Sequence, residues 1–238
     1  MLQNLEEVCA LKIRIKFEKT GCMKFVGHLD IMRYFQKVMR RADVDICYSE
    51  GFSPHQKMSF AAPLGVGLTS LSEYFDIEVN STDSSSKMIE RMNETMVEGM
   101  KVTGYRLLDE NSKNAMSIVA AADYNVTIIN KKILSRIDTF NDFMSQESIN
   151  IVKKTKKSEM SLDIKPMILE YSLDNDKIFM KLKTGSENNL KPELVINAFY
   201  NYLNEEFSQF DINTERLEIY GKREDEIIPL LDFGSEIN

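Results

Sequence analysis

Hydrophobic and polar residues alternate along the first part of the chain. Between residues 11 and 17 every second residue is apolar, and the residues between them are basic. This period of two predicts a strand with one buried face. From residue 28 to 42 apolar side chains recur at helical spacing, which predicts a helix with one face on the core. The same two patterns predict strands at 46–48, 74–79 and 100–108, and a helix at about 83–97.

The order strand, helix, strand, strand, helix, strand recurs after a polar linker at 109–115. Two such units predict an α+β protein of tandem ferredoxin-like (βαββαβ) domains with antiparallel sheets, over residues 1–110 and 111–238. One larger mixed sheet shared by both halves is the competing arrangement. In the second half, strands are expected within 117–129 and at 149–154, 167–173, 178–184 and 215–220, and helices at about 131–145 and 192–206. The second unit carries one extra strand in this interpretation.

The composition is that of a globular protein, with 43% hydrophobic and 28% charged residues among 238. No apolar run approaches the ~18–20 residues that cross a bilayer, and no basic segment followed by an apolar one marks a secretory leader. We therefore expect a cytoplasmic protein without a membrane partner. The cysteines Cys9, Cys22 and Cys47 are odd in number and widely spaced, which predicts reduced thiols.

The charge is unevenly distributed. The net charge is −7, yet residues 12–41 hold nine basic and two acidic side chains, a local charge of +7. Acidic residues gather after Gly221, which predicts an acidic C-terminal tail. An acidic protein with one basic island indicates a single anion-binding surface rather than general binding of polyanions.

Four of the nine basic residues of the island fall on the first predicted helix. Arg33, Lys37 and Arg40 lie at positions i, i+4 and i+7 and share one face, with Arg41 beside them. This stripe is a candidate phosphate-binding surface, and a solvated helix face is the alternative.

The basic residues of the first predicted strand have a structural explanation as well. Lys12, Arg14 and Lys16 point away from its buried side, where Asp76 and Glu78 of a neighbouring strand would pair with them.

The two histidines, His28 and His55, both lie near the basic island. Together with Asp30 they are candidate catalytic residues, because histidine exchanges protons near neutral pH. The alternatives are that His28 belongs to a helix start and that His55 bonds only its own loop. The chain lacks Cys-x-x-Cys and His-x-x-x-His spacing, so no metal site is expected.

Residues 51–67 form a long Gly- and Pro-rich segment that reads mainly as loop, with room for a short strand around 58–60. Gly65 and Gly67 would let backbone amides approach an anion, with Ser53 and Lys57 as further phosphate contacts. A glycine-rich turn into the next strand is the alternative interpretation.

Several short motifs resemble the radical-SAM-linked, or radical-SAM-associated, family of bacterial proteins. They are KFVGHLD (24–30), RRA (40–42), YSEGFSPH (48–55), FAAPLGVG (60–67) and EYFD (73–76), with DIKP (163–166) and LKPE (190–193) later in the chain. The resemblance implies a partnership with a radical SAM enzyme and points loosely toward RNA. It supplies no catalytic roles and no cofactor. The chain has no Cys-x-x-x-Cys-x-x-Cys motif to hold a [4Fe–4S] cluster, so it is not itself the radical SAM catalyst.

These observations favour a non-catalytic accessory protein that binds RNA, or an RNA–protein substrate, for a radical SAM enzyme. We expect the basic helix and the Ser53-Pro54-His55 turn to border one pocket. A metal-independent RNA-processing enzyme that uses His28 and His55 is one alternative. A subunit that only contacts other proteins is the other.

Overall fold

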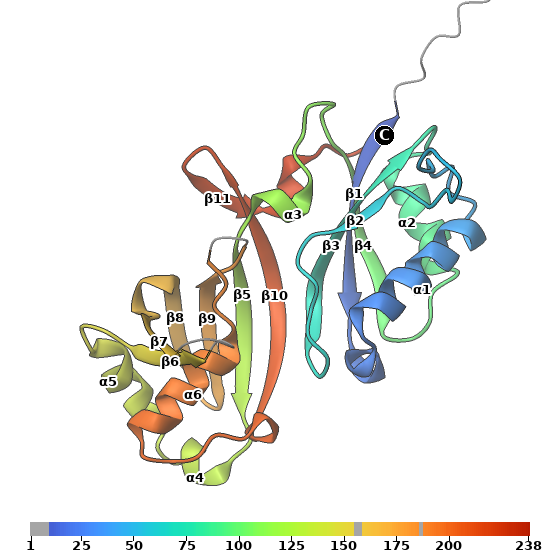
Figure 1. Cartoon of the computed structure of the whole chain (residues 1–238). Helices are drawn as coiled ribbons and strands as arrows, with labels where there is room; N and C mark the ends of the chain where they lie inside the picture. Colours follow the sequence, from blue (N-terminus) through green and yellow to red (C-terminus); the bar gives the residue numbers. More distant parts are fainter. Residues whose placement is uncertain (1–9, 155–158, 186–187) are drawn as a thin grey trace, which may run out of the picture.

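The computed structural model describes residues 10–154, 159–185 and 188–238, so Cys9 lies outside the described part. The first half contains β1 (Leu11–Lys19), α1 (His28–Arg41), β2 (Met58–Phe60), β3 (Thr69–Val79), α2 (Ser85–Asn93) and β4 (Met100–Leu107) (Figure 1). The second half contains α3 (Ala115–Ile118), β5 (Val119–Ile128), α4 (Lys131–Leu134), α5 (Phe140–Ser145), β6 (Asn150–Lys154), β7 (Glu159–Asp163), β8 (Ile168–Asp174), β9 (Lys177–Lys183), α6 (Pro192–Tyr202), β10 (Ile212–Arg223) and β11 (Glu226–Pro229). None of the described helices is long and apolar enough to cross a membrane.

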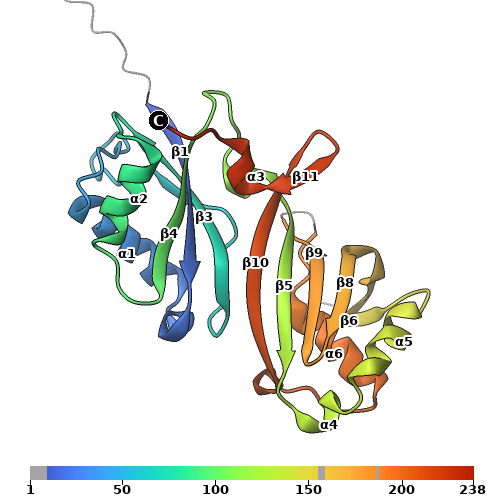
Figure 2. The ribbon, with the colours of Figure 1, turned by 180° about the vertical axis from the view of Figure 1, so that it is seen from behind.

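One large, mostly antiparallel sheet runs through both halves. Its strand order is β4-β1-β3-β10-β5-β9-β8 (Figure 2), and β2 lies beside β3 and β11 beside β10. The halves meet where β3 and β10 pair in parallel, with Thr69 opposite Glu215 and Ser70 opposite Arg216. This shared sheet is the competing arrangement that the sequence left open. A separate ribbon of β6 and β7 is attached to the second half.

The helices of the first half cover one face of its strands. The period-two pattern of β1 buries Ile13, Ile15 and Phe17, and the helical stripe of α1 buries Phe35 against them. The ring centroid of Phe35 lies 4.6 Å from that of Phe17 and 4.6 Å from that of Phe75. Phe60 of β2 joins the same aromatic cluster. The buried face of α1 therefore places the Phe35 ring among three other rings.

The C-terminal segment packs on the sheet. Leu230 is fully buried, and Leu231 follows it in a 3-10 turn, Leu230–Phe233. Gly104 leaves room for this turn, since a Cβ there would lie 2.7 Å from Leu231 Cδ1. Ser235 forms a backbone bridge with Leu107. The last residues of the acidic C-terminal stretch are therefore held against the sheet.

Three local predictions differ from the structure. Ile46 and Tyr48 make only isolated β-bridges, and the second strand is β2, which follows the 49–56 turn. The predicted strand at 74–79 begins earlier, at Thr69, in β3. Helix α2 ends at Asn93 rather than near 97, because the Asn93 side chain bonds both backbone groups of Val102.

The expected helix at 131–145 is broken into α4, a 3-10 turn (Ile137–Thr139) and α5. The hydroxyl groups of Ser135 and Thr139 donate to the carbonyl groups of Lys132 and Arg136. Such local side-chain bonds offer the backbone an alternative to a continuous helix.

Candidate functional site

The outward face of α1 is a cluster of cations, which we call the α1 surface. Arg33, Lys37, Arg40 and Arg41 are all exposed. Arg33 pairs with Asp30 at 3.1 Å, and both side chains are about two-thirds exposed, so solvent screens this ion pair. In the part of the chain that the structure describes, the other three have no ion-pair partner. Lys37, Arg40 and Arg41 therefore leave three positive charges uncompensated by a direct partner.

Two basic residues of β1, in contrast, are paired with carboxylates. Arg14 is fully buried and holds both carboxylate oxygens of Asp76, at 2.8 and 3.0 Å. Lys16 reaches across to Glu218 of β10 at 2.7 Å. The expected cross-strand pairing is confirmed for Arg14, and these charges hold the fold together instead of facing a ligand.

The turn that carries the GFSPH motif lies against α1. The Gln56 side chain donates to the carbonyl group of Gln36 in α1, at 3.3 Å. The hydroxyl group of Ser49 is 2.8 Å from His55 Nδ1 and also accepts from the His55 backbone N–H. Ser53 is exposed at the tip of the turn. The turn is thus fastened beside the α1 surface, and one His55 ring nitrogen is used to hold its shape.

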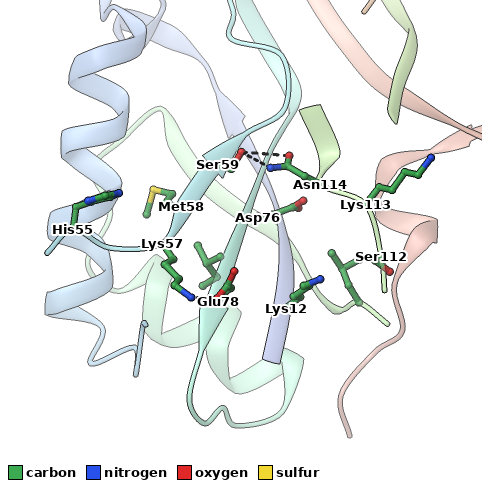
Figure 3. A pocket seen from close by; sticks show the side chains of 12 residues that line it. Lys12, His55, Lys57, Met58, Ser59, Asp76, Glu78, Ser112, Lys113 and Asn114 are labelled. Atoms are coloured by element: carbon green, nitrogen blue, oxygen red, sulfur yellow. Dashed lines mark hydrogen bonds and ion pairs between the residues drawn. The ribbon is translucent and has the colours of Figure 1, made fainter. Parts of the chain in front are cut away.

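Behind the turn lies a pocket of about 380 Å³ between β2, β3 and the linker before α3 (Figure 3). His55 and Lys57 line one end, and Lys113 lines the other. Lys57 bonds Glu78 at 2.5 Å, and this hydrogen bond raises the pKa of Lys57. Asp76 is already held by Arg14. Both carboxylates of the pocket, Asp76 and Glu78, therefore have cationic partners. The other two lysines that line it, Lys12 and Lys113, give the pocket a positive character.

His28 does not belong to this pocket. Its ring packs edge-on against Phe60, with centroids 5.2 Å apart, and it lines a different and much smaller cavity. His28 and Arg41 occupy the first and last positions of α1, which at 1.5 Å per residue places them about 20 Å apart. The structure therefore brings His55 and Lys57 together but does not bring His28, Arg41 and His55 into one site.

The glycine segment is also separate from the α1 surface. Gly67 has a φ of +94° and its N–H donates to the carbonyl group of Lys24, at 2.8 Å. That amide is not available to an anion, so Gly67 fits the alternative of a turn leading into β3. Gly65 lines a cleft between the two halves instead.

Sequence patterns did not indicate a buried ion-pair cluster at the junction of the halves. Arg216 of β10 bonds Glu73 of β3 and the carbonyl group of Ala62, and both charged side chains are at least 93% buried. Lys19 is 3% exposed beside them, and burial lowers its pKa, with the charge of Arg216 adding to the effect and that of Glu73 opposing it. Glu73 and Arg216 are 143 positions apart. Only the folded topology brings them together, so no local motif marks them.

Comparison with known proteins identifies a family. A family model described as "Uncharacterized protein conserved in bacteria (DUF2344)" matches residues 12–192, which span most of both halves. No curated protein matches the chain.

Proposed function

The chain belongs to the DUF2344 family of bacterial proteins, and we propose that it is a non-catalytic accessory protein that binds RNA, or an RNA–protein substrate. The α1 surface and the neighbouring GFSPH turn make the contacts in this proposal. The observation that carries it is a contrast between two sets of cations. Arg14 and Lys16 of β1 are paired with carboxylates, whereas Lys37, Arg40 and Arg41 are exposed without an ion-pair partner among the described residues.

The arrangement suits a phosphate backbone better than a single small anion. The three cations are spread along the exposed face of the second half of α1, and Lys113 adds a further positive charge in the adjacent pocket. Contacts of this kind give affinity without reading sequence, because every nucleotide presents the same phosphate. The proposal therefore does not name a particular RNA sequence.

Reversing two charges on the α1 surface should weaken RNA binding. For the double variant Arg40→Glu/Arg41→Glu we expect at least a ~10-fold loss of affinity for single-stranded RNA. The slope of log K against log salt concentration should fall by about 1.4, since each lost phosphate contact removes about 0.7. Both residues are exposed, so the free energy of unfolding should change little. Fluorescence anisotropy with a labelled RNA measures the affinity.

A matched control carries the same change in charge elsewhere. Lys131 and Lys177 are exposed in the second half, and Lys131→Glu/Lys177→Glu should leave affinity within about twofold of wild type. If both double variants lose affinity equally, net charge and not the α1 surface explains the binding. If the wild-type chain does not bind at about 50 mM salt, where phosphate contacts are strong, RNA binding is rejected.

The partner that we propose is a radical SAM enzyme, on the strength of the sequence resemblance. Affinity purification of the tagged chain from its own host should recover such an enzyme together with RNA. Recovery of the enzyme without RNA, combined with no RNA binding by the pure chain, would favour a subunit that only contacts proteins. The enzymatic alternative has less support, because His28 and His55 line different cavities.

We further propose that each half is a ferredoxin-like unit and that the chain works in the cytoplasm. The orders β4-β1-β3-β2 and β10-β5-β9-β8 are equivalent, with antiparallel pairing throughout. The free thiols of Cys22 and Cys47 suit a reducing compartment. An experimental structure with a different strand order in either half would contradict the first point.

A further inference from the structure

The tip of the GFSPH turn holds an aromatic ring out in solvent. Phe52 is fully exposed, and Tyr48, at the base of the same turn, is half exposed. Both belong to the segment that leads from α1 into β2. Because an aromatic ring gains free energy when it leaves water, a ring presented in this way is available to a partner.

The turn that carries Phe52 is closed at its base. The Ser49 N–H donates to the carbonyl group of His55 at 2.8 Å, and the Ser49 hydroxyl group accepts from the His55 N–H at 3.1 Å. Gly51 has a φ of +102°, which side chains rarely allow, and it redirects the chain just before Phe52. The ring is therefore presented by a fixed backbone, so a contact with it requires little further ordering.

The turn is joined to the basic part of α1. The Gln56 side chain donates to the Tyr48 hydroxyl group at 3.5 Å and to the carbonyl group of Gln36 in α1 at 3.3 Å. Arg40 lies one helical turn after Gln36, on the same side of the helix. Tyr48 is thus placed beside the uncompensated cations of the α1 surface, with Phe52 farther out on the same turn.

Aromatic rings beside uncompensated cations fit an unpaired nucleotide. Every nucleobase has a flat face that stacks on an aromatic ring, and its phosphate is attracted to nearby cations. The core of a protein interface, in contrast, is depleted of charged residues. The turn itself carries a single acidic side chain, Glu50, against the three uncompensated cations of the α1 surface. Charge and shape therefore both favour a nucleic-acid strand.

We propose that Phe52 stacks on an unpaired base and thereby makes the α1 surface selective for single-stranded over duplex RNA. This inference rests on the RNA binding proposed above. In a duplex the bases are stacked on one another inside the helix, where Phe52 does not reach them. The cations alone would give the opposite preference, because a duplex carries more phosphate charge per unit length than a single strand. Tyr48 offers a second ring nearer to α1.

The test compares two forms of one labelled RNA of about 12 nucleotides, which is bound as a single strand and after annealing to its complement. Fluorescence anisotropy measures both affinities. We expect the wild-type chain to bind the single strand at least ~10-fold more tightly than the duplex. Phe52→Ala should weaken binding of the single strand about tenfold, the effect of losing one stacked base, and leave binding of the duplex within about twofold. Phe52→Trp keeps a flat ring and should keep the preference.

The matched control removes an exposed phenylalanine elsewhere. Phe210 is 80% exposed in the 3-10 turn Gln209–Asp211 of the second half, and Phe210→Ala should bind both forms as the wild type does. Both rings are exposed, so neither alanine variant should unfold. Equal affinity of the wild type for the two forms overturns this inference and leaves RNA binding by the α1 surface standing. Phe52→Ala with the wild-type preference, or equal losses for Phe52→Ala and Phe210→Ala, also overturns it. Absence of any RNA binding by the wild type overturns both proposals.

Discussion

Replacing Glu73 with glutamine is expected to lower the free energy of unfolding by about 3–5 kcal/mol, the cost of leaving a buried charge without its partner. Glutamine keeps the size of the side chain and one oxygen acceptor, so the loss comes from the charge. Arg216 would keep a neutral oxygen, the Ala62 carbonyl group and its contact with Tyr124. Lys19 would lose the attraction of the Glu73 carboxylate. Equilibrium unfolding in urea measures the difference.

The matched control is Glu90→Gln on the exposed side of α2, where a change within about 0.5 kcal/mol is expected. Because Glu73 lies on β3 and Arg216 on β10, the pair fastens the two halves at the point where their strands meet. A loss below about 1 kcal/mol for Glu73→Gln would show that the pair does not carry this junction.

The second large loss of stability is expected from the buried face of α1. Phe35→Ala should lower the free energy of unfolding by about 3–5 kcal/mol, because the fully buried ring leaves a cavity among three other rings. The same measurement on Phe25→Ala provides the control, since that ring is 66% exposed and should matter little. Equal losses for the two variants would contradict the packing described for α1.

Sequence periodicity identified the elements in which one face is apolar and the other carries charged side chains. Both β1 and α1 were predicted within two residues of their ends, because the apolar residues of each pattern face the core on one side. The pattern could not place the second strand. Residues 46–48 are as apolar as Met58–Phe60, and both segments reach β3. Ile46 makes a single bridge to Val79, whereas Met58–Phe60 pair residue by residue with Phe75–Ile77 and so form the strand.

Charged residues were harder to interpret than apolar ones. Arg14 and Arg40 look alike in the sequence, yet one is fully buried against Asp76 and the other is exposed. The difference comes from residues on distant strands, which a local pattern does not contain. The β1 case was recognisable because an acidic strand of matching phase follows. No similar signal linked Glu73 to Arg216.

The most direct test of the central claim is a map of where RNA touches the chain. Wild-type protein with bound single-stranded RNA is crosslinked by ultraviolet light, and the modified peptides are identified by mass spectrometry. We predict that crosslinks concentrate in residues 33–57, which contain the cations of α1 and the GFSPH turn. Crosslinks confined to the second half, around α5 and β8, would contradict the assignment of RNA binding to the α1 surface.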